Sequence, residues 1–356
     1  MKLGIIGLPQ SGKTTIFNAL TRGHQPTTMT GGRIDIHTGV VDVPDERVDV
    51  LSRMFRPQKT IYAKVTYADI AGLEGSASKS GISGQLLNQL SQMDGFVHVV
   101  RCFENLNVPH PSGNVNPQRD ITSMDSELLI NDLISVERKQ EKLLEERKKG
   151  GGRDKALVDR EIALFEKMQD TLSQDIPLRN LDLSTEEEKL LAGFGFLTRK
   201  PVMILLNLSD GQSTPEIPYP HLRSKIVGLQ GKLEMELAQL PIDEAEMFMG
   251  EYGIQELGLN RVIGLSYDLL GLQSFFTVGE DEVRAWTVHR GASAYEAAGE
   301  IHTDLQKGFI RAEVVGYLDL VTLGGLAEAR SKGKLRLEGR DYLVKDGDIV
   351  HIRFNI

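Results

Sequence analysis

KLGIIGLPQSGKTTIFNAL, residues 2–20, places an apolar strand, a glycine-containing loop and an amphipathic helix directly one after another. The loop GLPQSGKT, residues 7–14, fits the pattern G-x-x-x-x-G-K-[ST]. Glycine lets the backbone approach a polyphosphate closely, and the amides at the start of a helix attract anions. Strand–helix alternation continues through residue 108. The pattern therefore predicts an α/β fold with a parallel-rich sheet and a phosphate-binding loop.

The residue types of this loop suit a nucleoside triphosphate. We expect Lys13 to contact the β- and γ-phosphates and to act catalytically, and the Thr14 hydroxyl to hold Mg²⁺. The other nucleotide-binding residues predicted in and beside the loop are Gly7, Pro9, Gln10, Ser11, Gly12 and Thr15.

A second motif, Asp69-Ile70-Ala71-Gly72, ends the apolar stretch 63–69, which reads as a strand. Asp69 is predicted to hold Mg²⁺ through water, and the Gly72 amide to sense the γ-phosphate as part of the catalytic site. Leu73 occupies the position where Ras-like GTPases carry a glutamine that orients the attacking water. Because leucine cannot hydrogen-bond water, we expect slow hydrolysis or a water positioned by another group.

A base-recognition loop is predicted after the apolar run 201–207, which reads as a buried strand of the same sheet. There Asn207-Leu208-Ser209-Asp210 is similar to the Asn-Lys-x-Asp motif of guanine-binding proteins but lacks its lysine. The alternative is an ordinary loop, since Asn and Asp favour turns in general. The residues predicted to bind the base are Asn207, Leu208 and Asp210.

The composition indicates an ordinary globular protein of two or three domains, with 356 residues, of which 40% are hydrophobic and 26% charged. The net charge of −9 argues against a general polyanion-binding protein, so a nucleic-acid contact requires a local basic patch. Cys102 is the only cysteine, which excludes an intrachain disulfide and favours a cytoplasmic location. The first residues do not read as a signal peptide, and no stretch approaches the ~20 apolar residues of a membrane span.

Two segments with 4-3-4-3 apolar spacing predict an antiparallel coiled-coil hairpin, inserted as a helical domain at residues 119–197. Three glycines, 150–152, separate the segments and cannot continue a helix. The tip is basic, and two interpretations stand: a solvated loop or an RNA contact. The expected core positions are Leu129, Leu133, Val136, Gln140, Leu143, Val158, Ile162, Phe165, Gln169 and Leu172. The basic tip residues are Arg147, Lys148, Lys149, Arg153 and Lys155.

Towards its end the chain changes character. An alanine-rich helix at 292–302 precedes short strands such as 342–344 and 348–354. This mixture predicts a small α+β domain at residues 276–356. The predicted nucleotide-binding domain then comprises residues 1–118 and 198–275, on either side of the helical insertion.

These segments resemble the YchF family, or Obg-like ATPases, of P-loop proteins related to translation factors. The resemblance implies a C-terminal TGS domain of β-grasp fold, a preference for ATP over GTP, and association with ribosomes. It also implies that Asn207 bonds the base edge, that Leu208 and Phe103 pack against its faces, and that an apolar residue at Leu73 is a family trait. The segments that carry it are GLPQSGKTTIFNALT (7–21), VPDER (43–47), DIAGL (69–73), HVVRCFEN (98–105), NLSD (207–210), residues 283–314 and LEGRDYLVKDGDIVHIRFNI (337–356).

Three positions depart from that family's pattern. Gln10 stands where the family has an asparagine that ligates potassium in related NTPases, which leaves a K⁺ requirement open. Arg33 stands at the switch threonine that closes over Mg²⁺, and it either pairs with the γ-phosphate or faces water. Asp210 replaces a glutamate, a change that suits a guanine edge. The threonines available to replace the one at position 33 are Thr28, Thr30 and Thr38.

The sequence therefore predicts a cytoplasmic switch that binds and slowly hydrolyses ATP with Mg²⁺. We expect it to dock on the ribosome or on RNA through the coiled-coil tip and the TGS domain. Two alternatives are a nucleotide-binding interaction module with little or no turnover, and a GTP-specific GTPase. No membrane partner and no DNA partner is predicted.

Overall fold

The computed structural model describes residues 1–25, 36–70, 82–149, 152–251, 254 and 256–355, which divide into two compact units. The first unit comprises residues 1–39 and 66–259, and the second comprises residues 40–65 and 260–356. The predicted nucleotide-binding domain includes residues 40–65, whereas the structure packs them in the second unit. The predicted helical insertion, in contrast, lies wholly within the first unit.

A six-stranded sheet organises the first unit, in the order β2-β4-β1-β5-β6-β7. β1 pairs in parallel with β4 and β5, and β6 pairs in parallel with β5 and β7, which confirms the predicted parallel-rich α/β fold. The apolar run after residue 201 returns to this sheet as predicted. The strands are β1 (Lys2–Ile6), β2 (Ile36–Asp42), β4 (Lys64–Ile70), β5 (Gly95–Arg101), β6 (Val202–Asn207) and β7 (Ser224–Leu229).

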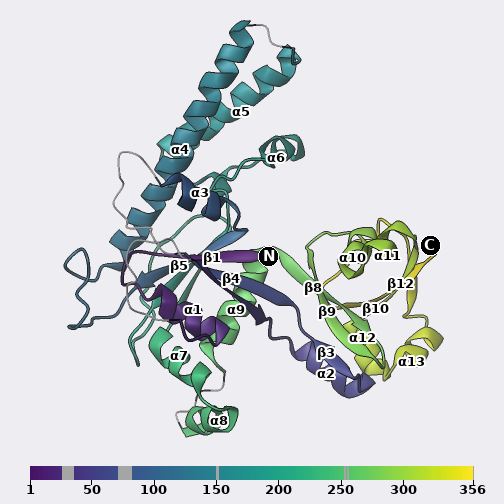
Figure 1. Cartoon of the computed structure of the whole chain (residues 1–356). Coiled ribbons are helices and arrows are strands. Elements are labelled where there is room, and N and C mark those ends of the chain that lie inside the picture. Colours follow the sequence, from purple (N-terminus) through teal and green to yellow (C-terminus); the bar gives the residue numbers. More distant parts are fainter. Residues whose placement is uncertain (26–35, 71–81, 150–151, 252–253, 255, 356) are drawn as a thin grey trace. The chain divides into compact units, whose positions relative to one another are not determined.

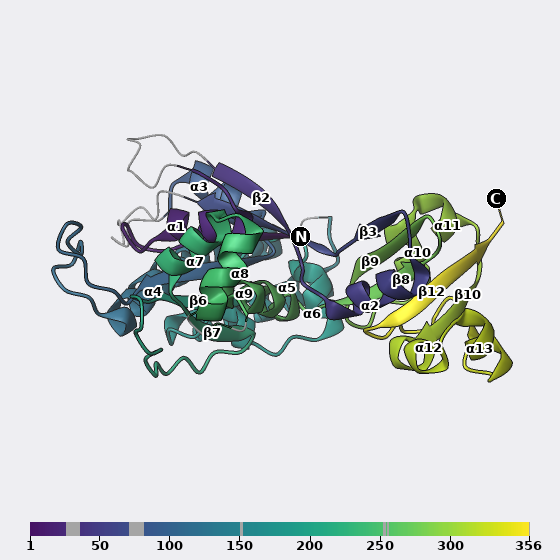
Figure 2. The same cartoon turned by 90° about the horizontal axis from the view of Figure 1, so that it is seen from below.

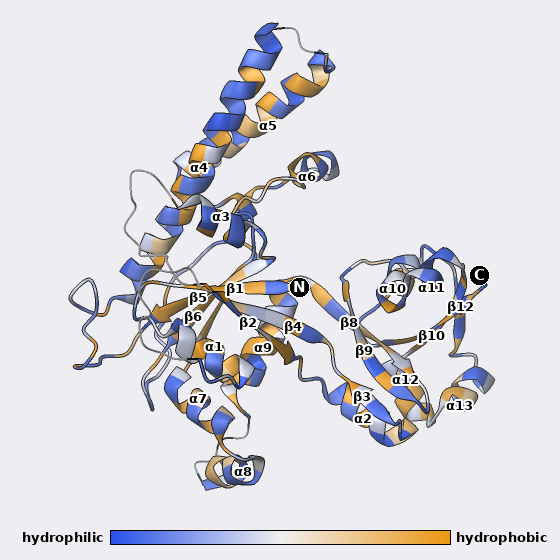
Figure 3. Ribbon diagram, viewed as in Figure 1, coloured by the Kyte–Doolittle hydropathy of each residue, from blue (hydrophilic) through white to orange (hydrophobic). Residues whose placement is uncertain are grey.

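Helices cover this sheet, and its central strands are buried along their whole length. Every residue of β5 and β6 is buried, as expected for parallel strands covered on both faces. Figure 3 shows β1, β5 and β6 as the apolar centre of the sheet, and Figure 2 shows α1 and α7 lying side by side. The helices of this unit outside the hairpin are α1 (Lys13–Thr21), α3 (Gly84–Ser91), α6 (Thr185–Leu191), α7 (Gly231–Gln239) and α8 (Ile242–Glu251), with a 3₁₀ turn η1 (Leu178–Asn180). The next helix, α9 (Gly258–Leu269), begins in this unit and continues in the second one.

The predicted coiled-coil hairpin is present as α4 (Pro117–Lys149) and α5 (Lys155–Ser173). Figure 1 shows the two helices packed along each other, with the end of α4 and the start of α5 at the far end from the sheet. Arg147 of α4 pairs with Asp159 of α5, and Glu137 of α4 accepts a hydrogen bond from Gln169 of α5. A step of ten residues back along α4 therefore corresponds to a step of ten residues forward along α5. This register confirms the antiparallel arrangement. The apolar seam contains Leu129, Val136, Leu143, Val158, Ile162, Phe165, Met168 and Leu172.

The hairpin is joined to the rest of the first unit by a buried carboxylate on α4. Asp132 is 1% exposed and accepts hydrogen bonds from the backbone amides of Leu197 (2.9 Å) and Thr198 (2.7 Å). The Thr198 hydroxyl donates a third bond at 2.7 Å. These three donors satisfy a group that is costly to bury unpaired. Asp132 therefore fixes α4 to the segment that leads into β6.

A second six-stranded sheet organises the other unit, in the order β11-β10-β12-β8-β9-β3. β12 pairs in parallel with β8, and its partner β10 is antiparallel to it, so the sheet is mixed. Figure 2 shows α10 and α11 on one side of β10 and β12, and α12 and α13 on the other. The strands are β3 (Lys59–Ile61), β8 (Leu272–Val278), β9 (Glu282–His289), β10 (Phe309–Gly316), β11 (Arg336–Glu338) and β12 (Asp348–Phe354). The helices are α2 (Glu46–Phe55), α10 (Ala294–Ile301), α11 (Thr303–Lys307), α12 (Tyr317–Leu323) and α13 (Leu326–Ser331).

The predicted alanine-rich helix forms the centre of this unit's core. Ala294, Ala297 and Ala298 are fully buried, and their short side chains let α10 approach the sheet closely. The predicted strand at 342–344 is wrong, because only one bridge, between Leu343 and Ser293, forms there. The main chain of this stretch bonds α10's N-terminal region instead, since the amide of Ala294 donates to the Tyr342 carbonyl.

In the part of the chain that the structure describes, no helix is both long and apolar enough to cross a membrane.

The buried Asp132 makes the stability of the first unit depend on pH. Burial raises the pKa of Asp132 to about 6, although the hydrogen bonds from Leu197 and Thr198 act in the opposite direction. The folded protein therefore holds this proton more tightly than the unfolded chain, and the stability that it provides is lost as pH rises towards about 6. Between about pH 4 and pH 7, we expect the free energy of unfolding to fall by ~2–3 kcal/mol relative to Asp132→Asn.

Urea unfolding followed by circular dichroism measures this difference. Asp182→Asn, which removes an exposed carboxylate of the same unit, is the matched control. A difference between wild type and Asp132→Asn that stays constant with pH would contradict the prediction.

Candidate nucleotide-binding site

The backbone of the predicted phosphate-binding loop adopts conformations that other sequences rarely allow. Gly12 has a φ of 93° and Gln10 a φ of 61°, both in the left-handed region. α1 begins at Lys13, and its N-cap Gly12 makes no side-chain capping bond. The amides of the first helical turn are therefore not satisfied by a cap, as an anion-binding helix start requires.

This loop lies against the carboxyl ends of two strands at distances that only glycine permits. A Cβ on Gly7 would lie 2.4 Å from the Val99 carbonyl oxygen of β5. A Cβ on Gly12 would lie 2.2 Å from Nδ2 of Asn207 at the end of β6. The two glycines of the motif thus serve the packing of the loop on the sheet as well as its turn.

Lys13 points its ammonium group back over the loop. Its Nζ donates to the carbonyl oxygens of Gly7 (2.9 Å) and Leu8 (3.0 Å). Burial lowers the pKa of Lys13 to about 8, and the carboxylate of Asp69 opposes this shift. The loop carbonyls and Asp69 together hold a cation where the sequence predicts phosphate binding.

Thr14 and Asp69, the two predicted metal ligands, meet in the structure. The Thr14 hydroxyl donates to Oδ2 of Asp69 at 2.8 Å, and Asp69 is only 6% exposed. Burial raises the pKa of Asp69, while Thr14, Lys13 and His37 lower it. Among the described residues, no three His, Cys, Asp or Glu side chains form a metal-binding group. Two oxygen donors fit Mg²⁺, which is commonly held by one or two protein ligands plus phosphate oxygens and water.

Asn207 joins the phosphate-binding loop to the start of α7. Its Nδ2 donates to the Ser11 carbonyl at 3.0 Å, and its Oδ1 accepts from the Gly231 amide at 3.2 Å. The side chain is 3% exposed. A Cβ on Gly231 would lie 2.6 Å from Oδ1, so Gly231 is a third glycine that this arrangement requires. One amide hydrogen of Asn207 is used in this way, and its predicted contact with the base edge stays a prediction.

The other residues predicted around the base have different surroundings. Leu208 is 5% exposed and packs in the apolar core of the first unit, and Asp210 is exposed. Phe103 is half-buried beneath the guanidinium of Arg101, 4.6 Å from the ring centroid. Gln212, which the sequence reasoning missed, bonds the Cys102 carbonyl at 2.9 Å and accepts from the Ser209 amide. It ties the loop after β6 to the end of β5, and no local motif indicates this.

Several of the predicted site residues lie outside the described part of the chain, and others are exposed on the surface of the protein. Gly72, Leu73, Arg33, Thr28 and Thr30 are outside the described part of the chain. Thr38 is exposed on β2. Of the loop residues, Gln10 is exposed, Pro9 and Thr15 are half-buried, and Ser11 is 2% exposed.

A buried histidine–carboxylate pair near the end of β5 was not predicted. Nε2 of His110 lies 2.9 Å from Oδ2 of Asp120, and both side chains are buried. Arg119 also pairs with Asp120 at 2.8 Å. The pair fixes the segment after β5 to the first turn of α4. Burial raises the pKa of the nearby Cys102 thiol to about 12, which disfavours the reactive thiolate form.

Comparison with protein families agrees with this geometry. A family model described as a 50S ribosome-binding GTPase matches residues 2–144, which contain the phosphate-binding loop and Asp69. The first unit therefore contains a P-loop nucleotide-binding domain of the GTPase class. A second model, YchF-GTPase_C, described as a protein of unknown function (DUF933), matches residues 272–355.

Relatives along the full chain narrow this class to one family. The Ribosome-binding ATPase YchF of Escherichia coli O157:H7 is 42% identical, over 100% of this chain and 99% of its own length. The protein of the same name from Bacillus subtilis is 38% identical over 99% of both. A solved structure, the YchF GTPase of Schizosaccharomyces pombe, has a TM-score of 0.86 and 32% identity, covering 99% of this chain and 97% of that one. The chain belongs to the YchF family.

Gly12→Ala tests how the loop packs on Asn207. The added Cβ would meet Nδ2 at 2.2 Å with the backbone at a φ of 93°. We expect a loss of ~2–4 kcal/mol in the free energy of unfolding without nucleotide, measured with denaturant. Gly113 is the matched control, because its φ is 88° and nothing lies within 4 Å of its Cβ position.

In Gly113→Ala, the free energy of unfolding should fall by only ~1–2 kcal/mol, which is the cost of holding a residue with a Cβ in the left-handed conformation. Equal losses in the two variants would show that contact with Asn207 is not the cause.

Proposed function

We propose that this protein is a nucleotide-dependent switch that binds ATP and hydrolyses it slowly with Mg²⁺, and that associates with the ribosome in the cytoplasm. The observation that carries the proposal is the convergence of Lys13, the Thr14–Asp69 pair and Asn207 on one phosphate-binding loop. The names of the relatives, which describe ribosome-binding ATPases, support the same activity and partner.

In this mechanism the chain positions the triphosphate and stabilises its charge. The loop amides and the ammonium of Lys13 would hold the β- and γ-phosphates, and the Gly72 amide would add a donor at the γ-phosphate. Thr14 and Asp69 would hold Mg²⁺, which when bound neutralises charge on the phosphate oxygens. Leu73 offers no hydrogen bond to the attacking water, which accounts for a slow rate. Whether K⁺ is needed stays open, since Gln10 replaces the expected asparagine.

ATP is the proposed substrate because the loop after β6 lacks the lysine of guanine-binding motifs. Leu208 occupies that position and is buried in the core. Asn207 would use its second amide hydrogen on the base edge, and Phe103 would pack against a base face. The exposed Asp210 favours the alternative of GTP, because a carboxylate in this loop reads guanine in GTPases. Competition between the two nucleotides decides between them.

The hairpin tip is the proposed ribosome-binding element, together with the C-terminal unit. At the tip, Arg147, Lys149 and Arg153 already pair with acidic residues of the hairpin: Asp159, Glu145 and Glu146, respectively. Such exposed pairs are weak and exchange readily for phosphate contacts. Within the described part of the hairpin, Lys148 and Lys155 have no ion pair, which leaves two cations for a partner.

Lys13→Ala tests the enzymatic proposal. We expect multiple-turnover phosphate release from ATP to fall by roughly 100-fold or more, because the charge on the γ-phosphate loses its ammonium partner. Lys232→Ala, which removes an exposed lysine from α7, should leave the rate unchanged. Calorimetric titrations of wild type should show ATP binding at least as tightly as GTP.

Each contrary result has a distinct meaning. Absence of phosphate release from wild type with either nucleotide would leave only a binding module. Binding of GTP about tenfold tighter than ATP would support the GTPase alternative.

The double variant Lys148→Glu/Lys155→Glu tests the proposed tip contact. Because each reversal removes a phosphate contact and adds repulsion, we expect ribosome cosedimentation to weaken by roughly tenfold and to depend less steeply on salt concentration. Lys189→Glu/Lys225→Glu makes the same charge change at exposed positions away from the tip. Equal cosedimentation of wild type and the tip variant would rule out this contact.

A further inference from the structure

One segment of the second unit connects two strands of the first unit's sheet. Residues 43–63, here called the strap, lie between β2 and β4, which are neighbours in the first sheet. The strap's own elements, α2 and β3, belong to the second unit. β3 pairs in parallel with β9, and the amides of Gln58 and Lys59 donate to the carbonyls of Glu280 and Asp281 at 3.0 and 3.1 Å.

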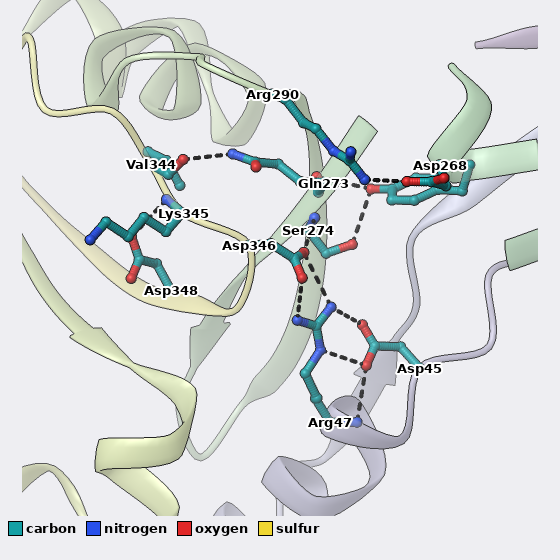
Figure 4. Close-up of polar contacts among 11 residues, drawn as sticks. Asp45, Arg47, Asp268, Gln273, Ser274, Arg290, Val344, Lys345, Asp346 and Asp348 are labelled. Carbon is teal, nitrogen blue, oxygen red and sulfur yellow. Dashed lines mark hydrogen bonds and ion pairs between the residues drawn. The ribbon is translucent and has the colours of Figure 1, made fainter. Parts of the chain in front are cut away.

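Arg47 fastens the strap to the turn before β12, as Figure 4 shows. Its Nε and Nη2 donate to the two oxygens of Asp45 at 2.9 and 2.8 Å. Its Nη1 donates to Oδ2 of Asp346 at 2.7 Å, and Nη2 reaches the other oxygen at 3.3 Å. The guanidinium also lies 5.1 Å from the ring centroid of Phe276. Two carboxylates and an aromatic face therefore hold one planar cation.

The turn that receives Arg47 is itself fixed. Oδ1 of Asp346 accepts from the Ser274 amide at 3.0 Å, and the Gly347 amide donates to the Ser274 carbonyl at 2.9 Å. The hydroxyl of Ser274 lies 3.0 Å from that of Tyr267 on α9. Gly347 has a φ of 87°, and a Cβ there would lie 3.1 Å from Nη1 of Arg47. Displacement of Arg47 would therefore disturb the hydrogen bonds of this turn with β8 and the start of β12.

The two carboxylates around Arg47 favour an arginine over a lysine at this position. Burial would lower the pKa of Arg47, but the carboxylates of Asp45 and Asp346 outweigh it and raise the pKa. The side chain of Arg47 is 28% exposed and that of Asp346 is 54% exposed, so water partly screens their contact. A lysine could not bridge both carboxylates through parallel N–H groups, whereas the arginine fork does so.

The two strands that flank the strap in sequence, β2 and β4, adjoin segments that we expect to sense nucleotide. β2 follows residues 26–35, which contain the predicted switch position, and β4 ends with Asp69, the predicted metal ligand. We propose that the strap couples the nucleotide state to the C-terminal sheet, with the Arg47–Asp346 contact as the connection. The inference rests on the proposed nucleotide binding. Because binding couplings are reciprocal, a partner on the C-terminal unit would change nucleotide affinity, typically by about 5- to 150-fold.

Hydrogen exchange on the full chain tests this coupling, with a non-hydrolysable ATP analogue and Mg²⁺ as the probe. In wild type, we expect the amides of β8 and residues 345–349 to change their exchange rate by roughly threefold or more on binding. Arg47→Ala and Asp346→Asn should still bind the analogue, with an affinity within about threefold of wild type, but lose this response. Asp346→Asn keeps the shape of the turn, so it remains informative if Arg47→Ala folds poorly.

Arg290→Ala is the matched control, because Arg290 pairs with Asp268 in the same unit and makes no contact with the strap (Figure 4). It should keep the wild-type response. Failure of wild type to bind the analogue would overturn the proposed function. Binding without any change in exchange at β8 and residues 345–349 would overturn the coupling, and a response that persists in both Arg47→Ala and Asp346→Asn would overturn the assigned connection.

Discussion

The nucleotide-binding unit depends on how closely the backbone of one loop approaches the carboxyl ends of β5 and β6. Gly7 lies against the Val99 carbonyl and Gly12 against the side chain of Asn207, at distances that exclude a methyl group. Asn207 also bonds the start of α7 at Gly231. A single buried amide therefore determines the relative position of three segments that meet at the site. Rigid placement of this kind is what a site that works by positioning and electrostatics requires.

A buried polar side chain also joins segments at the base of the hairpin. Asp132 is buried on α4 and accepts hydrogen bonds from groups of Leu197 and Thr198, just before β6. Along the rest of the hairpin, stability comes from the apolar seam between α4 and α5, because its exposed ion pairs are individually weak. The fold thus supplies a long helical arm that is stiff along its seam and firmly attached where it begins.

The strap gives a physical reason for the segment VPDER, residues 43–47. Asp45 caps α2 by accepting from the Arg47 amide at 3.0 Å, and it also holds the Arg47 guanidinium. Their contacts lie within the second unit, with Asp346 and Phe276, so this segment serves the C-terminal sheet although it lies between two strands of the first one.

Local patterns in the sequence determined the phosphate-binding loop, the buried strands and the coiled-coil hairpin, because glycine requirements and apolar periodicity act over a few residues. Tertiary structure alone decided which side chains meet. Asn207 and Gly231 are 24 residues apart, Asp132 and Leu197 are 65 apart, and Arg47 and Asp346 are 299 apart. The stretch 342–344 was predicted as a strand on local grounds but forms one bridge to Ser293, since its partner lies 50 residues earlier in the chain. Contacts over such separations depend on how the whole chain packs, and no local pattern encodes them.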